Sequence, residues 1–397
     1  MIALFLLPIY ALVNYYLFVR ILRWFQICHK FFKNRIVKYS LLTIYIFFAS
    51  SALISFLLPK GKLCRFMAGL SNYWLGILMY LFLVILIADI IRIIAKRNGK
   101  LYKSKLYTPK GFMINGVICA IVIIAICTYG FINARIIHTT NYDVKIDKQV
   151  KNMDNLKVVM IADLHIGYSI DNSQIARMVN KINQENADLV VICGDIFDNS
   201  YDAIDNVPKL VSLLKSIKSK YGTYAVYGNH DISEKILVGF TFNYRDKKQS
   251  DLRMDKILSD SNITLLRDQT ILIDDSFYLV GRADATRPGR NIDERKTASD
   301  LLKNLDKSKP IIVLDHQPRE LDLLKENGAD LDLSGHTHDG QIFPMNIIVH
   351  MIWDNAYGIK EYGDFKSIVT SGVGVYGPNM RIATIAEVNV INIKFKK

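Results

Sequence analysis

The sequence predicts four transmembrane helices followed by a soluble α/β domain. Three observations support this prediction. Four long apolar runs lie in the first 140 of 397 residues, short β-branched runs alternate with amphipathic stretches after residue 156, and charge divides between the two parts. Residues 1–140 hold 17 Lys and Arg against one acid, a balance of +16, whereas residues 141–397 hold 33 bases and 36 acids, a balance of −3. The basic excess therefore belongs to the predicted membrane part and argues against a nucleic-acid partner.

The apolar runs cover residues 2–19, 41–58, 74–94 and 112–134 and are 18 to 23 residues long. A helix needs about 20 residues to cross the hydrocarbon core of a bilayer. Four such runs in succession, three of them without any charge, favour membrane spans over buried helices of a soluble protein. Asp89 in the third run lies one turn from Arg92, and we expect both side chains to reach the membrane interface rather than to form an ion pathway.

The loops between the runs predict the orientation. Residues 20–39 contain six Lys and Arg and residues 92–111 contain seven, against three in residues 59–73. Loops rich in Lys and Arg stay in the cytoplasm, so we expect the soluble domain on the extracytoplasmic side of the cell membrane. The sequence thus predicts a multi-pass protein with a membrane domain at 1–138, a linker at 139–155 and a soluble domain at 156–397.

Five short apolar strands of the soluble part each end in a turn rich in Asp, Asn and His. The turns read DLH at 163–165, GDIFD at 194–198, GNHD at 228–231, DHQP at 315–318 and GHTH at 335–338. We expect these turns to meet, because functional groups collect beyond the carboxyl ends of strands in α/β sheets. Carboxylate, amide and imidazole groups are ligands of divalent metals, and five of the eight histidines fall in these turns. The glycines at 194, 228 and 335 are expected to let the backbone turn sharply.

This ordered set of turns resembles the calcineurin-like metallophosphoesterase superfamily over about residues 156–392. It is most similar to membrane-attached bacterial phosphoesterases with N-terminal transmembrane helices. The resemblance implies a four-layer α/β/β/α sandwich with two divalent metal ions at one edge. Mixed sets of Asp, His and Asn ligands accept Mn, Fe, Zn or Co. Those phosphoesterases carry the motif GHTHGGQ, whereas here Asp339 replaces the first glycine after the histidines and adds an acid near the site.

The resemblance also implies a ligand set, which divides between the two metals. The first metal would be held by Asp163, His165 and His338, the second by Asn229, His316 and His336, and Asp195 would bridge both. A carboxylate has two oxygens and can span two cations, whereas a neutral imidazole binds one.

By the same resemblance, His230 would protonate the leaving oxygen, since an ordinary histidine pKa near 6.5 permits proton donation near neutral pH. Asp231 would orient or polarise His230. Asp198 would support the site from behind the ligands. Asp315 is expected either to support it in the same way or to lie on the surface.

The sequence therefore predicts a membrane-anchored, dinuclear-metal-dependent phosphoesterase that hydrolyses phosphate esters by attack of a metal-bridged hydroxide. Phosphodiesters are the favoured class of substrate. The alternative is a non-catalytic membrane sensor or transporter whose soluble domain binds a phosphorylated ligand. Membrane anchoring suggests a lipid or cell-envelope phosphoester as the substrate. Residues 240–246 (FTFNYRD) and 282–290 (RADATRPGR) either contact that substrate or form ordinary surface loops. Metal identity, physiological substrate, the choice between monoesters and diesters, and oligomeric state stay open.

Overall fold

The chain divides into two compact units. The computed structural model describes residues 2–97, 107–233, 236–237, 240–241 and 249–397. The first unit comprises Met1–Ile132, Lys235–Phe242 and Gly377–Met380. The second comprises Asn133–Glu234, Asn243–Tyr376 and Arg381–Lys397.

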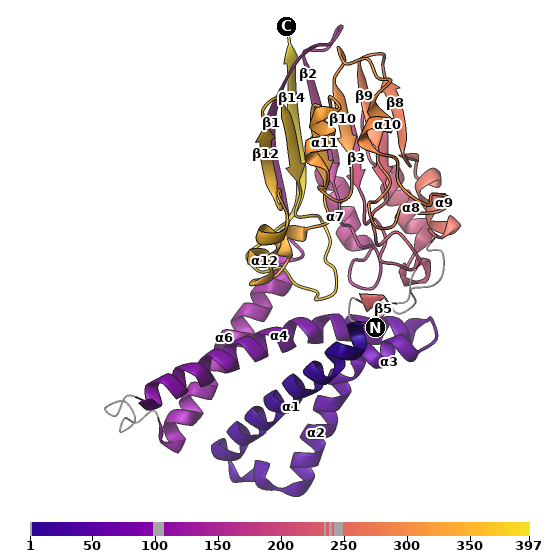
Figure 1. The fold of residues 1–397 in the computed structure, drawn as a ribbon. Helices are drawn as coiled ribbons and strands as arrows, with labels where there is room; N and C mark the ends of the chain where they lie inside the picture. Colours follow the sequence, from indigo (N-terminus) through magenta and orange to yellow (C-terminus); the bar gives the residue numbers. More distant parts are fainter. Residues whose placement is uncertain (1, 98–106, 234–235, 238–239, 242–248) are drawn as a thin grey trace. The chain divides into compact units, whose positions relative to one another are not determined.

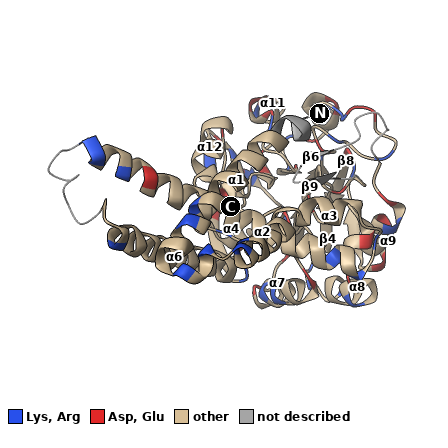
Figure 2. Cartoon of the chain, turned by 90° about the horizontal axis from the view of Figure 1, so that it is seen from below, with Lys and Arg blue, Asp and Glu red and all other residues tan. Residues whose placement is uncertain are grey.

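The first unit is mainly helical, and its helices carry few charged side chains away from their ends (Figures 1 and 2). Its elements are α1 (Ile2–Cys28), η1 (Lys30–Lys33), α2 (Arg35–Ala49), α3 (Ser51–Leu57), α4 (Lys62–Arg97), α6 (Pro109–Asn133) and the two-stranded pair of β5 (Ile236–Leu237) and β6 (Phe240–Thr241).

Two of the described helices, α4 and α6, are long and apolar enough to cross a membrane. A third span exists if α2 and α3, which are bent by 53° at the break between them, count as one. The predicted spans at 74–94 and 112–134 coincide with α4 and α6. The prediction at 41–58 falls across the bend, and the one at 2–19 lies in α1, a helix that continues through Arg20 and Arg23. The described residues thus give two or three candidate spans where the sequence predicts four.

The second unit contains two six-stranded mixed sheets and several short helices (Figure 1). The first sheet has the order β1-β14-β2-β3-β4-β7 and the second the order β12-β13-β11-β10-β9-β8. The strands of the first sheet are β1 (Ile137–Gln149), β2 (Asn155–Ile161), β3 (Leu189–Cys193), β4 (Thr223–Val226), β7 (Ile263–Leu265) and β14 (Ala386–Lys396). Those of the second are β8 (Gln269–Ile273), β9 (Phe277–Gly281), β10 (Ile311–Leu314), β11 (Leu331–Ser334), β12 (Gly358–Tyr362) and β13 (Phe365–Val369).

The helices of this unit are α7 (Asn172–Gln184), η3 (Tyr201–Ala203), α8 (Val207–Lys215), α9 (Leu252–Asp260), α10 (Ala298–Leu302), α11 (Leu321–Glu326), η4 (His338–Gly340) and α12 (Met345–Ile352).

Alternating strand residues supply three hydrophobic clusters. In β2, Val158 joins a cluster that contains residues of both sheets, whereas Val159 joins a cluster with the helices α7, α8 and α9. A third cluster joins the second sheet to α10 and α11.

The segment predicted as a linker, 139–155, instead lies largely in a sheet. Its first part belongs to β1, which pairs in parallel with β14 from Ile137 to Gln149. Val144 and Ile146 are buried and Lys145 between them is exposed, the period of two expected of a strand with one face in the core. The polar residues of this segment are its outward face, which is why the composition resembles a linker.

Candidate metal centre

The five predicted turns lie directly after five parallel strands, three in the first sheet and two in the second. Asp163 and His165 follow β2, Asp195 follows β3 and Asn229 follows β4; His316 follows β10, and His336 and His338 follow β11. The side chains gather into two adjoining groups, and both groups contain ligand types suited to a metal ion.

The first group consists of Asp163, His165 and His338, whose potential ligand atoms all lie within 4.8 Å of one another. The Nε2 atoms of the two imidazoles are 3.0 Å apart, and His338 Nε2 lies 3.6 Å from Asp163 Oδ1. Burial lowers the pKa of His165 to about 3 and holds that of His338 well below its ordinary value. Both rings are therefore neutral near pH 7 and keep a lone pair for a cation.

The second group consists of Asp195, His316 and His336, with Asn229 beside it. His316 Nε2 lies 3.2 Å from Asp195 Oδ2, 3.2 Å from Asn229 Oδ1 and 3.2 Å from His336 Nδ1. Asp195 Oδ2 is also 3.6 Å from His165 Nε2. Asp195 is thus the carboxylate that lies between the two groups, as expected of a bridging ligand.

The surroundings of His316 show that this set of residues fits a cation. Its Nδ1 lies 2.9 Å from the carbonyl oxygen of Cys193, which only accepts, so Nδ1 carries the hydrogen. The Nε2 of a neutral ring then has a lone pair, which faces the oxygens of Asp195 and Asn229. Burial alone would lower the pKa of His316, but the negative charges of Asp195 and Asp163 raise it well above its ordinary value. The carboxylates therefore favour positive charge among these atoms, and a divalent metal would supply it.

The backbone is strained at most of the ligand positions. Five of the seven predicted ligands have a left-handed φ, from 46° to 73°: Asp163, His165, Asp195, His336 and His338. Such conformations cost of order 1–3 kcal/mol each for residues other than glycine and cluster at functional sites.

Glycines around the ligands provide space as well as freedom of φ. Of the three glycines predicted to turn the chain, Gly194 has a positive φ of 82°, whereas Gly228 and Gly335 do not. A Cβ at Gly228 would lie 2.2 Å from Asp195 Oδ1, and one at Gly335 would lie 2.6 Å from Asp163 Oδ2. Gly374, which the sequence did not single out, leaves room in the same way for the carbonyl oxygen of Leu164.

His230 lies beside the ligands, but its neighbour is not the one predicted. Its backbone N–H donates to Asp195 Oδ1 at 2.7 Å, and its Nδ1 is 2.6 Å from Asn199 Oδ1. Asp231 is fully buried, and its two oxygens accept the backbone N–H groups of Phe197 and Gly228 at 2.8 and 2.7 Å. Asp231 thus links the turns after β3 and β4. Asn199, rather than Asp231, is the residue that contacts the His230 ring.

Arg381 is a buried cation that the sequence analysis missed. Its guanidinium donates to the carbonyl oxygens of Ser371 and Gly374 at 2.6 and 2.7 Å and lies 3.5 Å from His338 Nδ1. Burial lowers its pKa to about 10, so it remains charged at neutral pH. Only the folded chain reveals that Arg381 contacts these carbonyl groups and His338, since no other charged residue accompanies it in sequence. The glycine-rich stretch before Arg381 is the one local feature that could have pointed to it.

The acids and arginines that the sequence placed near the site contact other groups of the protein. Asp315 is buried and pairs with Arg282 at 3.0 Å, so it is not a surface residue, and Arg282 is not available to grip a phosphate. Arg287 donates from Nη1 to the carbonyl oxygen of Asn229 at 3.1 Å, which puts it next to the site. Arg290 donates to a backbone carbonyl at 2.7 Å. Asp198 carries a backbone N–H that donates to Ile166 O.

Of the predicted stretch 240–246, residues 242–246 lie outside the described residues, and the structure describes none of the side chains of this stretch.

The additional acid after the histidines has a partner. Asp339 Oδ1 lies 2.7 Å from Nε2 of His350, a residue of α12. The Trp353 ring that follows α12 meets the His336 ring edge-to-face at 5.2 Å. Helix α12 therefore lies at the side of the metal centre.

The part of the chain that contains these groups is similar to known proteins. Residues 156–340 match the calcineurin-like phosphoesterase family. The chain is 28% identical to an uncharacterized metallophosphoesterase of Campylobacter jejuni over 98% of this chain and 97% of that protein. It is 30% identical to one of Helicobacter pylori over 66% of this chain and 65% of that protein. It is 26% identical to a transmembrane protein with a metallophosphoesterase domain of Danio rerio over 85% and 78% of the two chains.

Proposed function

This chain carries a calcineurin-like metallophosphoesterase domain, and from that premise we propose that it is a membrane-anchored, dinuclear-metal phosphoesterase that prefers phosphodiesters. The observation that carries the proposal is the convergence of seven ligand-type side chains on two adjoining positions joined by Asp195. The domain is that of a metal-dependent phosphoric ester hydrolase, and apolar helices associate the chain with a membrane.

Each metal would have its own ligand set. Asp163, His165 and His338 would hold one ion, Asn229, His316 and His336 the other, and Asp195 would contact both. When bound, two divalent ions polarise phosphoryl oxygens and lower the pKa of a water nucleophile. Hard and borderline donors of this kind accept Mn, Fe, Zn or Co.

His230 is proposed as the acid that donates a proton to the leaving oxygen. The bond from its backbone N–H to Asp195 holds its turn against the ligands, and the contact of its Nδ1 with Asn199 Oδ1 fixes the ring. If Nδ1 donates to Asn199, the opposite nitrogen, Nε2, is the atom that exchanges the proton. General acid catalysis of this kind contributes about 10²–10⁴-fold to a rate.

Charge near the site supports the preference for diesters. A phosphate monoester carries close to two negative charges above its second pKa of about 6, whereas a diester carries one. Asp339 adds a carboxylate next in sequence to His338, and two arginines near the site, Arg381 and Arg287, already donate to backbone carbonyls. This balance disfavours a dianion more than a monoanion.

The proposed membrane arrangement has four spans, with the two loops richest in Lys and Arg in the cytoplasm and the four-layer catalytic domain outside. A lipid or cell-envelope phosphoester would be the substrate. Helix α12 at the side of the centre supports this choice, because Met351, Ile352 and Ile347 are 81%, 69% and 52% exposed. Exposed apolar side chains on one short helix suit insertion into the surface of a bilayer.

Hydrolysis of bis-p-nitrophenyl phosphate by the full-length protein in detergent tests the proposal. Turnover should require added Mn, Zn, Fe or Co and should be faster than with p-nitrophenyl phosphate. Asp195→Asn should lose metal, measured by elemental analysis, together with turnover, whereas Asp260→Asn on the exposed end of α9 should change neither. Bound metal without turnover on any ester would instead support the alternative of a sensor or transporter that only binds a phosphorylated ligand.

A further inference from the structure

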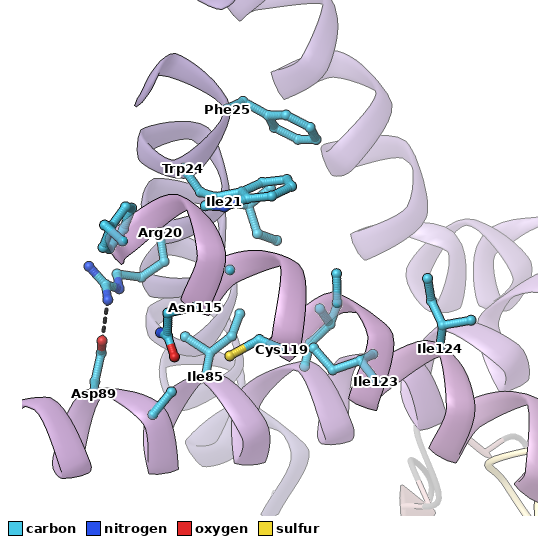
Figure 3. Close-up of a pocket in the computed structure, with 15 residues that line it drawn as sticks. Arg20, Ile21, Trp24, Phe25, Ile85, Asp89, Asn115, Cys119, Ile123 and Ile124 are labelled. Carbon is cyan, nitrogen blue, oxygen red and sulfur yellow. Dashed lines mark hydrogen bonds and ion pairs between the residues drawn. The ribbon is translucent and has the colours of Figure 1, made fainter. Parts of the chain in front are cut away.

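A cavity of about 270 Å³ lies within the first unit, between α1, α4 and α6 (Figure 3). Its walls are almost entirely apolar, with side chains from all three helices such as Phe25, Leu81, Ile85, Ala120, Ile123 and Ile124. Ligand sites usually measure roughly 300–1,000 Å³, so this volume suits one hydrocarbon chain rather than a bulky ligand.

One end of the cavity is polar. Arg20 of α1 forms an ion pair with Asp89 of α4 (Figure 3). The Tyr16 hydroxyl donates to the other oxygen of Asp89 at 2.7 Å. The partner of Asp89 is thus an arginine of another helix, a contact that the sequence did not predict. The Nε–H of Arg20 is buried and has no hydrogen-bond acceptor among the residues that the structure describes. A buried donor without an acceptor is destabilising, and an anionic oxygen would satisfy it.

Positive charge is concentrated at this end. The guanidinium carbons of Arg20, Arg23 and Arg92 lie 5.3, 5.8 and 5.0 Å from the centre of the Phe112 ring. Asp89 is the single acid of residues 1–140, so it neutralises one of the three arginines. Two net positive charges therefore remain beside Phe112, a residue that lines the apolar cavity.

We propose that this cavity binds an anionic phospholipid, with one acyl chain between α1, α4 and α6 and its phosphate at Arg20, Arg23 and Arg92. Basic pockets between membrane helices on the cytoplasmic side recognise anionic headgroups, and the phosphate supplies the acceptor that Arg20 Nε lacks. The site rests on the proposed membrane embedding of these helices but not on the catalytic reaction. This lipid site lies in the first unit, whereas the metal ligands lie in the second.

Native mass spectrometry of the full-length protein tests this site. The protein in detergent is mixed with phosphatidylglycerol or phosphatidylcholine of the same acyl chains, and the retained lipid is counted. The unaltered protein should retain phosphatidylglycerol in preference. Ala120→Phe, which fills the cavity without changing charge, should lose retention of phosphatidylglycerol. Arg23→Gln with Arg92→Gln should weaken it about fivefold for each arginine, and Arg35→Gln on α2, away from the cavity, should leave it unchanged.

Turnover of bis-p-nitrophenyl phosphate, measured on the same samples, should stay unchanged in every variant and shows that the chain is folded. The proposal would be overturned if the unaltered protein retained the two lipids equally, or if the cavity variant and the double arginine variant both retained phosphatidylglycerol in full. It would also be overturned if soluble glycerol phosphate bound as well as phosphatidylglycerol. Lipid preference without turnover in the unaltered protein would instead mean that the proposed enzymatic function fails while the lipid site stands.

Discussion

Replacing Gly228 with alanine should impair metal binding without unfolding the protein. The added Cβ would lie 2.2 Å from Asp195 Oδ1 and 2.7 Å from His316 Cδ2. Ordinary contacts begin near 3.4 Å, so the carboxylate between the two ligand groups has to move by about 1 Å. A displacement of about 1 Å lowers catalysis by about 10²-fold, and overpacking costs about 1–3 kcal/mol of folding free energy.

Three measurements on the same preparation check this expectation. Elemental analysis gives the metal content, bis-p-nitrophenyl phosphate gives the turnover, and thermal unfolding gives the stability. We expect metal content below that of the unaltered protein, turnover reduced about 100-fold, and a cooperative melt that is only modestly shifted. Gly69→Ala is the matched control, because a Cβ at Gly69 meets no atom within 4 Å. Full metal content and full turnover in Gly228→Ala would refute the view that this glycine makes room for Asp195.

Three further predictions concern the acid, the buried carboxyl groups and α12. His230→Ala should keep its metal but lose about 10²–10⁴-fold of its turnover on an alkyl phosphodiester and much less on an aryl one; equal losses would argue against proton donation by His230. Burial raises the pKa of Asp332 to about 7, above its value of about 3.9 in an unfolded chain. The unfolded chain then releases this proton first, so the free energy of unfolding should fall as pH rises from about 4 to about 7. In Asp332→Asn this part of the fall should disappear, and identical pH profiles of unfolding for the two proteins would contradict it. Met351→Ser combined with Ile352→Ser should slow hydrolysis of a phosphodiester lipid in vesicles but not of bis-p-nitrophenyl phosphate, and equal rates on vesicles would exclude insertion of α12 into the bilayer.

The strand-end turns could be predicted from the sequence because their information is local. A buried β-branched run followed at once by Asp, His or Asn specifies both the strand and the position of the side chain. The parallel arrangement of strands then brings distant turns together, and this is how residues as far apart as Asp163 and His338 meet.

Other parts of the site depend on contacts between segments that have no mark in the sequence. Asn199 follows a predicted turn but becomes the neighbour of His230 only through the packing of the turns after β3 and β4. Arg381 acquires its role from carbonyl groups that a looped segment presents to it. Asp231 has the composition of a catalytic partner, yet two backbone N–H groups take its oxygens.

The membrane part shows the same division. Hydropathy identifies apolar helices, whereas the partner of Asp89 depends on which helices lie next to one another. Arg92 is closer in sequence, but Arg20 from another helix makes the ion pair. A charge inside an apolar run is thus visible in the sequence, and its partner is not.

Strand β1 begins at Ile137, four residues after α6 ends at Asn133, and it covers the edge of β14 along almost its entire length. A truncated protein that starts at residue 144 or 156, chosen to obtain a soluble enzyme, would remove part or all of β1. The uncovered N–H and C=O groups of β14 would then invite pairing with other chains. Expression of the catalytic part without its helices should therefore begin near residue 134, and aggregation of shorter versions would reflect a missing strand rather than a missing membrane.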